Sequence, residues 1–399
     1  MNILRIFSIA SIVMGLLPIS PSFGQSMTEP EPQISFAKEK RTLAYYVAQA
    51  ELWWSIVQAD MTVEEPWYQY YRACRNAHGT ANWKDAFKEE SPALRFGYEI
   101  VELLETHIPN TFTYHFVKGS TGGVSPEYGK HLIQAYRMNP DFEGLLADVV
   151  TYATSTHDHA LRKEANERWY RNHGISSGFL DFGYNLLQSV PENAILLTAH
   201  DNDSYPVWML QDALNIRPDV WVLNIDFFLF DGFRVPVFEE MGIPPFVLED
   251  VNINDYEANW ANVVKHVLMH HTGDRPLFIS QTLAPKWYEG FEDRLKVQGL
   301  ALKYTQEDQS LVEESIRLWN SVWRLDQLKR SLDHDDAQIR LDEMNLSYLP
   351  ALKETCLHYE SLGLDSELEA ARIWGKTLTS RVPSHSIAKT YAPYFSQQE

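Results

Sequence analysis

An apolar run in the middle of the chain ends abruptly in polar and acidic side chains. Residues 193–199 read NAILLTA, and a second apolar run, 219–228, reads DVWVLNIDFF. The candidate site residues follow the first run or lie within the second: His200, Asp201, Asn202, Asp203, Tyr205, Asn224 and Asp226. Carboxylate and amide oxygens of this kind can ligate Mg²⁺ or Ca²⁺, or hold the hydroxyl groups of a sugar.

The elements around these residues determine whether they meet. The run 194–199 is typical of a strand buried on both faces. Residues 204–216 predict a helix with Ser204 as its N-cap, and residues 219–228 are rich in the β-branched and aromatic residues of strands. Strand, helix and strand within about thirty residues form a βαβ unit with parallel strands. The two polar segments are therefore expected at one edge of a sheet, where ligands bind in open α/β folds.

The same sheet is predicted to continue. After a helix over 256–271, RPLFIS (275–280) and LALKYT (300–305) predict a third and a fourth strand. Ser280, Gln281 and Thr282 follow the third strand and extend the polar rim. We therefore predict an α/β domain over residues 176–306 with a small parallel, Rossmann-like sheet.

Helical periodicity predominates on both sides of this domain. Residues 36–175 contain apolar side chains at steps of three and four, and short helices with brief turns suggest a loosely tetratricopeptide-like, helical-repeat segment. Residues 307–399 predict helical hairpins, including one around Gly363. The expected fold class is thus α/β plus all-α, with the sheet domain flanked by helical-hairpin segments.

The N-terminus and the charge predict the compartment and exclude some partners. Residues 1–24 contain Arg5, a short apolar core and small residues at the end, as a secretory signal peptide does. We expect a periplasmic or secreted protein without membrane insertion after cleavage. A formal charge of −20 argues against nucleic acid as a partner. Cys74 and Cys356 are the two cysteines, and their spacing does not decide whether they pair.

Residues 193–228 resemble the soluble region of a family of multi-spanning membrane proteins. That family, long catalogued as a domain of unknown function, includes an animal protein O-mannosyltransferase. The residues that carry the resemblance are Asp201, Asn202, Asp203, Ser204, Tyr205, Pro206, Trp208, Arg217, Asp219, Val220 and Asn224. It resumes at Arg275 and Leu295. His200 replaces a glycine of the family pattern, and this sequence lacks the transmembrane part. The resemblance implies a shared exported module with a role in glycan or polypeptide handling, and it does not carry an active site over to this chain.

Two functional hypotheses follow. The first is an exported, non-enzymatic protein with a binding or scaffold role, linked to glycosylation, whose partner is a protein or a glycan. The alternative is a metal-dependent, glycosyltransferase-like enzyme that acts on glycans through Asp201, Asp203 and Asp226. The sequence points to no particular metal or cofactor. Aspartate and asparagine also end strands and cap helices, so a purely structural interpretation of the cluster stands beside both hypotheses.

Overall fold

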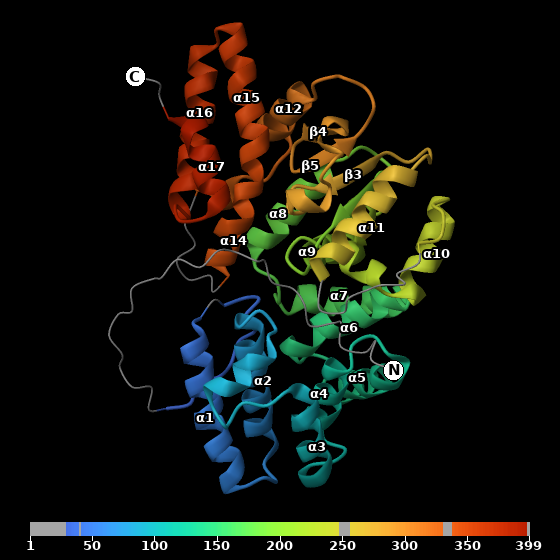
Figure 1. The fold of residues 1–399 in the computed structure, drawn as a ribbon, viewed down its shortest axis with the longest axis vertical. Coiled ribbons are helices and arrows are strands. Elements are labelled where there is room, and N and C mark those ends of the chain that lie inside the picture. Colours follow the sequence, from blue (N-terminus) through green and yellow to red (C-terminus); the bar gives the residue numbers. More distant parts are fainter. Residues whose placement is uncertain (1–28, 40, 247–255, 330–336, 397–399) are drawn as a thin grey trace. The chain divides into compact units, whose positions relative to one another are not determined.

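A computed structural model describes residues 29–39, 41–246, 256–329 and 337–396 (Figure 1). The predicted signal peptide, residues 1–24, lies outside the described residues. The chain divides into two compact units, residues 1–174 and 175–399. The second unit contains both the predicted α/β domain and the C-terminal helices, and the boundary between these two at residue 306 stays a prediction.

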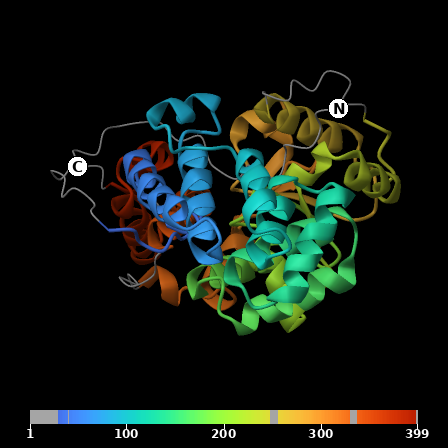
Figure 2. The ribbon, with the colours of Figure 1, turned by 90° about the horizontal axis from the view of Figure 1, so that it is seen from below.

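The first unit is helical, as the periodicity predicted. Its helices follow one another through the blue to green part of the chain (Figure 1, Figure 2). They are α1 (Leu43–Ala59), α2 (Glu64–Thr80), α3 (Gly97–His107), α4 (Phe112–Thr121), α5 (Pro126–Met138), α6 (Glu143–Ser155) and α7 (His159–Arg171). Helices α1 and α2, α4 and α5, and α6 and α7 pack in consecutive pairs. The tetratricopeptide-like assignment of these pairs stays a prediction.

The second unit combines a small sheet with helices. The strands are β1 (Ile195–Thr198), β2 (Trp221–Asn224), β3 (Leu277–Ser280), β4 (Leu295–Gln298) and β5 (Ala301–Tyr304). The helices before and among them are α8 (Ser177–Gln188), α9 (Tyr205–Leu214), α10 (Asp231–Met241) and α11 (Tyr256–His270). The helices after them are α12 (Val312–Ser321), α13 (Asp326–Lys329), α14 (Gln338–Asn345), α15 (Leu349–Leu362), α16 (Asp365–Arg381) and α17 (Ser386–Phe395). The predicted combination of α/β and all-α structure is therefore confirmed.

The sheet is mixed, which corrects the prediction of parallel strands throughout. Among the described residues its order is β2-β1-β3-β5-β4. Strand β1 pairs in parallel with β2 and β3, whereas β5 is antiparallel to both β3 and β4. Strand β4 was not predicted, because Lys296 interrupts its apolar residues. Gly299, with a φ of 60°, makes the tight turn to β5, and only antiparallel strands can be joined so closely. Three parallel strands do not establish a Rossmann-like sheet.

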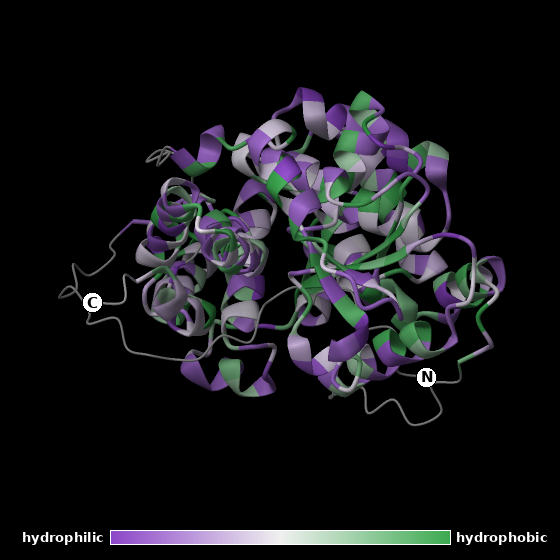
Figure 3. Ribbon diagram, turned by 90° about the horizontal axis from the view of Figure 1, so that it is seen from above, coloured by the Kyte–Doolittle hydropathy of each residue, from purple (hydrophilic) through white to green (hydrophobic). Residues whose placement is uncertain are grey.

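The central strands form the core of the second unit. All residues of β1 and β3 are buried, as their continuous apolar runs predicted. Figure 3 shows these strands as hydrophobic, whereas the helices around them carry both kinds of side chain. Cys74 in α2 of the first unit and Cys356 in α15 of the second are both buried free thiols.

Arg217 and Asp219, two residues of the family resemblance, fasten the starts of the parallel strands. Arg217 Nη1 donates to the carbonyl oxygens of Leu187 (2.9 Å) and Val190 (3.0 Å), at the end of α8. Its guanidinium also binds both carboxylate oxygens of Asp219, each at 2.9 Å. This hydrogen-bonded pairing lowers the pKa of Asp219 to about 2. These two residues therefore position β1 and β2 and lie at the opposite ends of the strands from the candidate site.

Candidate functional site

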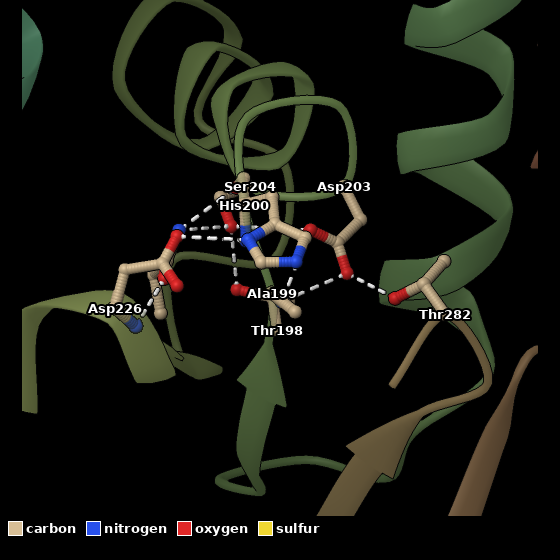
Figure 4. Close-up of polar contacts among 8 residues, drawn as sticks. Thr198, Ala199, His200, Asp203, Ser204, Asp226 and Thr282 are labelled. Carbon is tan, nitrogen blue, oxygen red and sulfur yellow. Dashed lines mark hydrogen bonds and ion pairs between the residues drawn. The ribbon is translucent and has the colours of Figure 1, made fainter. Parts of the chain in front are cut away.

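The turn after β1 is organised by the buried carboxylate of Asp203, which is 1% exposed (Figure 4). The backbone N–H of Ala199 donates to both carboxylate oxygens, at 3.1 and 3.0 Å. Thr282, which follows β3, donates its hydroxyl to the same carboxylate. Asp203 therefore ties the end of β1 to the end of β3.

Asn224 joins the ends of β1 and β2 in the same way. Its side-chain amide donates to the carbonyl oxygen of His200 (2.8 Å) and to the hydroxyl of Ser204 (3.0 Å). Its side-chain oxygen accepts from the backbone N–H of Asp226 at 2.7 Å. Ser204 precedes α9, as predicted, but its hydroxyl lies 2.7 Å from that of Thr198 and does not cap the helix. The buried hydroxyls and amide thus form one internal network.

His200 and Asp226 are half-buried members of this network. The backbone N–H of His200 donates to Asp226 Oδ2 at 3.1 Å, and the ring Nδ1 lies 3.2 Å from the same oxygen. The φ of His200 is 64°, in the left-handed region that glycine adopts most easily. The resembling family has a glycine at this position. Here the two contacts with Asp226 offset the backbone strain of a larger residue.

Two tryptophans from distant parts of the chain enclose the His200 ring. Trp260 in α11 and Trp287 in the 3₁₀ turn Pro285–Trp287 approach it edge to face, with ring centroids 4.9 and 5.7 Å away. Trp287 also donates its indole N–H to Glu257 at 2.6 Å. Neither ring was predicted, because neither tryptophan lies in a polar segment. The polar residues 280–282 were predicted to lie at the sheet edge, and Trp287 follows them closely along the chain. Their position was the one feature of the sequence that could have placed Trp287 near the site.

Burial and charge shift two pKa values strongly in this cluster. Burial disfavours the charged imidazolium of His200, but the carboxylates of Asp226, Asp203 and Asp201 outweigh it and raise the His200 pKa to about 9. Burial raises the pKa of Asp203 to about 7, against the opposing hydrogen bonds from Thr282 and Ala199. At neutral pH, His200 is therefore protonated and forms an ion pair with Asp226.

These shifts predict that the second unit loses stability as the pH rises. Between pH 6.5 and 9 the folded state keeps a proton on His200 that the unfolded state releases, so folding is favoured below this window and the advantage disappears through it. The expected loss is on the order of 3 kcal/mol of unfolding free energy. Asp203, with its pKa raised from 3.8 to about 7, adds a loss of the same sign at lower pH. Urea unfolding at a series of pH values and constant ionic strength measures both losses of unfolding free energy.

The matched control for the upper window is Asp226→Asn, which removes the charge that raises the His200 pKa. Its unfolding free energy should change much less between pH 6.5 and pH 9 than that of the wild type. An identical pH profile in the two proteins would show that the charge of Asp226 does not keep the proton on His200.

The structure brings most of the predicted rim together. His200, Asp203, Asn224 and Asp226 share one hydrogen-bonded network, and Thr282 joins it from β3. Asp201, Asn202 and Tyr205 lie half-buried on the turn and at the start of α9. Gln281 points elsewhere, because its side chain donates to the carbonyl oxygen of Gly299 at 2.7 Å.

The acidic cluster does not have the arrangement of a metal site. In Figure 4, Asp203 and Asp226 lie on either side of His200 and bind protein donors. Throughout the described ranges, no group of three or more His, Cys, Asp or Glu side chains is placed to hold a metal ion. The interpretation of Asp203 as a structural residue is therefore the one that its contacts support.

Comparison with known proteins finds one similarity, over part of this region. No curated protein and no solved structure matches the chain. Within the described residues, none of the helices combines the length and the apolar character needed to cross a membrane. Residues 179–235, from α8 into α10 and including β1, β2 and the His200–Asp226 pair, match the family model described as TMEM260-associated domain 2. That match agrees with the resemblance drawn from residues 193–228.

Proposed function

We propose that the chain is an exported protein with a binding or scaffold role in glycan or polypeptide handling, and that it catalyses no reaction itself. The resemblance of residues 193–228 to a family that includes an animal protein O-mannosyltransferase motivates the choice of process, and the domain match at residues 179–235 agrees with that resemblance. The partner is then a protein or a glycan, met in the periplasm or outside the cell. The charge of −20 disfavours nucleic acids and anionic lipids.

The proposal rests on the contacts that the carboxylate groups of Asp203 and Asp226 make. The oxygens of Asp203 accept hydrogen bonds from Ala199 and Thr282, and Oδ2 of Asp226 faces His200. Oδ1 of Asp226 is sealed from solvent and accepts no hydrogen bond from any described residue. A metal-dependent transferase needs carboxylates that converge on a space open to substrate. These carboxylates instead hold three strand ends in one arrangement, as a rigid recognition module requires.

One observation favours the alternative, a metal-dependent enzyme acting on glycans through Asp201, Asp203 and Asp226. His200 and Asp203 have strongly shifted pKa values and are neighbours on one turn. Such clusters are common in active sites, although structural ion pairs produce them as well. The two functions differ in whether the cluster binds a divalent cation and whether a sugar is turned over.

Calorimetric titration with Mg²⁺, Mn²⁺ and Ca²⁺ and a sugar-transfer assay with nucleotide-linked and lipid-linked donors separate these functions. We expect neither cation binding nor turnover, together with saturable binding to a mannose-bearing glycan or glycopeptide in a direct titration. The matched variants are Asp203→Asn in the buried network and Asp201→Asn on the half-buried turn. Turnover that disappears in Asp203→Asn, with an unchanged circular dichroism spectrum, would replace the binding function by the enzymatic one.

If the chain neither turns over a sugar nor binds the glycan, the remaining prediction is that its partner is a protein. A titration with the unglycosylated form of the same peptide then decides it. Failure of both the glycan titration and the peptide titration contradicts the proposal.

A further inference from the structure

Two histidines on neighbouring helices of the first unit face each other. Nδ1 of His115, in α4, lies 2.8 Å from Nδ1 of His131, in α5, and the two ring centroids are 5.0 Å apart. Both residues are half-buried, so solvent reaches the pair. A neutral imidazole has one N–H group and one nitrogen with a free lone pair. The contact is therefore a hydrogen bond in which one ring donates its Nδ1 proton to the other.

The backbones of α4 and α5 hold the two rings at this separation. The two helices pack against each other, and Gly119 lies one turn after His115. A Cβ atom placed on Gly119 would lie 2.7 Å from the backbone nitrogen of Leu132, the residue after His131. Because Gly119 has no side chain, the helices can approach closely enough to bring the two imidazoles together.

The surroundings keep both imidazoles neutral at pH 7, with a lone pair available. Burial lowers the pKa of His115, and His131 and the ammonium group of Lys118 lower it further. Burial also lowers the pKa of His131, together with Lys118 and against the carboxylates of Glu105 and Glu127. Lys118 forms an ion pair with Glu105 at 3.4 Å. Two of these three charged neighbours are carboxylates, so no net positive charge opposes a cation at the pair.

We propose that His115 and His131 bind a Cu²⁺ ion through their Nδ1 nitrogens. Imidazole is a favoured ligand of divalent transition metals, and Cu²⁺ binds nitrogen ligands most tightly among them. Two bonds of about 2.0 Å that meet at the right angle of a tetragonal Cu²⁺ site place their nitrogens about 2.8 Å apart, whereas a tetrahedral Zn²⁺ site needs about 3.3 Å. The separation of 2.8 Å between the two Nδ1 atoms therefore favours Cu²⁺.

Binding replaces the proton between the rings by the ion. The two rings turn so that both lone pairs face Cu²⁺, and the donor ring moves its Nδ1 proton to its own Nε2 by exchange with water. At neutral pH no net proton is released. The described ranges supply no group of three metal-binding side chains, so water completes the coordination. This site belongs to the helical unit and does not depend on the function proposed for the second unit.

Calorimetric titration of the untagged chain with Cu²⁺, Ni²⁺ and Zn²⁺ at neutral pH tests the site. We expect saturable binding of one Cu²⁺ ion, tighter than the binding of Ni²⁺ or Zn²⁺. His115→Gln and His131→Gln should each weaken it at least about tenfold, because each variant removes a ligand. His270→Gln is the matched control and should keep the wild-type affinity. It disrupts another histidine pair, His266 and His270 of α11, whose ring centroids lie 4.5 Å apart.

NMR spectra of the wild-type protein provide a second measurement that needs no variant. Substoichiometric Cu²⁺, which is paramagnetic, should broaden the imidazole signals of His115 and His131 before those of His266 and His270. If neither His115→Gln nor His131→Gln folds, this order decides, and earlier broadening of the α11 pair overturns the site. So does the absence of saturable Cu²⁺ binding, wild-type affinity in a folded His115→Gln or His131→Gln, or a loss confined to His270→Gln.

Discussion

Replacing Asp226 with alanine should lower the free energy of unfolding by about 3–5 kcal/mol, the cost of removing one partner from a buried ion pair. His200 is 15% exposed at its side chain and would lose its counter-ion. Its backbone N–H would also lose its acceptor, at a residue held in the left-handed region. The pKa of His200 should fall from about 9 toward 6.5. Urea unfolding and an NMR titration of the imidazole measure the two effects.

Asp201→Asn is the control, because this substitution removes one charge from the same turn and leaves the His200–Asp226 pair in place. It should change the unfolding free energy by less than about 1 kcal/mol. An equal loss in both variants would mean that general disturbance of the turn, and not the loss of the ion pair, destabilises the protein.

Asn185→Leu should cost about 4 kcal/mol, because it leaves the buried Tyr348 hydroxyl and two part-buried backbone groups of Arg324 without partners, at about 1–3 kcal/mol each. Asn185, in α8, is fully buried. Its side-chain oxygen accepts from the backbone N–H of Arg324 at 2.7 Å. Its amide donates to the Arg324 carbonyl and to the Tyr348 hydroxyl, each at 2.8 Å. Asn185 thereby fastens the segment before α13 and the start of α15 to α8. Urea unfolding measures the loss, and limited proteolysis shows whether the C-terminal helices detach.

Tyr348→Phe is the matched comparison, because it removes a single one of these hydrogen bonds and keeps the ring. Its expected cost is about 1 kcal/mol. If Asn185→Leu were no more destabilising than Tyr348→Phe, the two backbone hydrogen bonds to Arg324 would contribute nothing, and other contacts would hold the segment before α13.

The elements that position the site were predictable because their signals are local. Strand β1, Ile195–Thr198, forms within the uninterrupted apolar run 194–199, and Ser204 precedes α9 as predicted. Parallel pairing of β1 and β2 followed from the helix between them. From this pairing came the correct expectation that His200 and Asp226 lie at one sheet edge.

The partner that each side chain at that edge binds was not predictable from the sequence. Asp203 could have faced solvent, a metal ion or the backbone, and its choice depends on Thr282, which lies 79 residues along the chain. Similarly, the edge-to-face rings of Trp260 and Trp287 reach His200 only through the packing of α11 and the turn before β4. Residue type allows all of these arrangements, and only the partners brought by the fold select among them.

The sequence by itself determined the helical segments, four of the five described strands, the polar rim, and the resemblance with which the match at residues 179–235 agrees. The tertiary structure alone decided that β5 runs antiparallel to both of its neighbours, that His200 pairs with Asp226, and that Asp203 accepts a hydrogen bond from Thr282. The physical reason is the separation along the chain of the residues that interact. Burial periodicity is written into neighbouring residues, whereas desolvation and ion pairing depend on groups that meet only when the chain has folded.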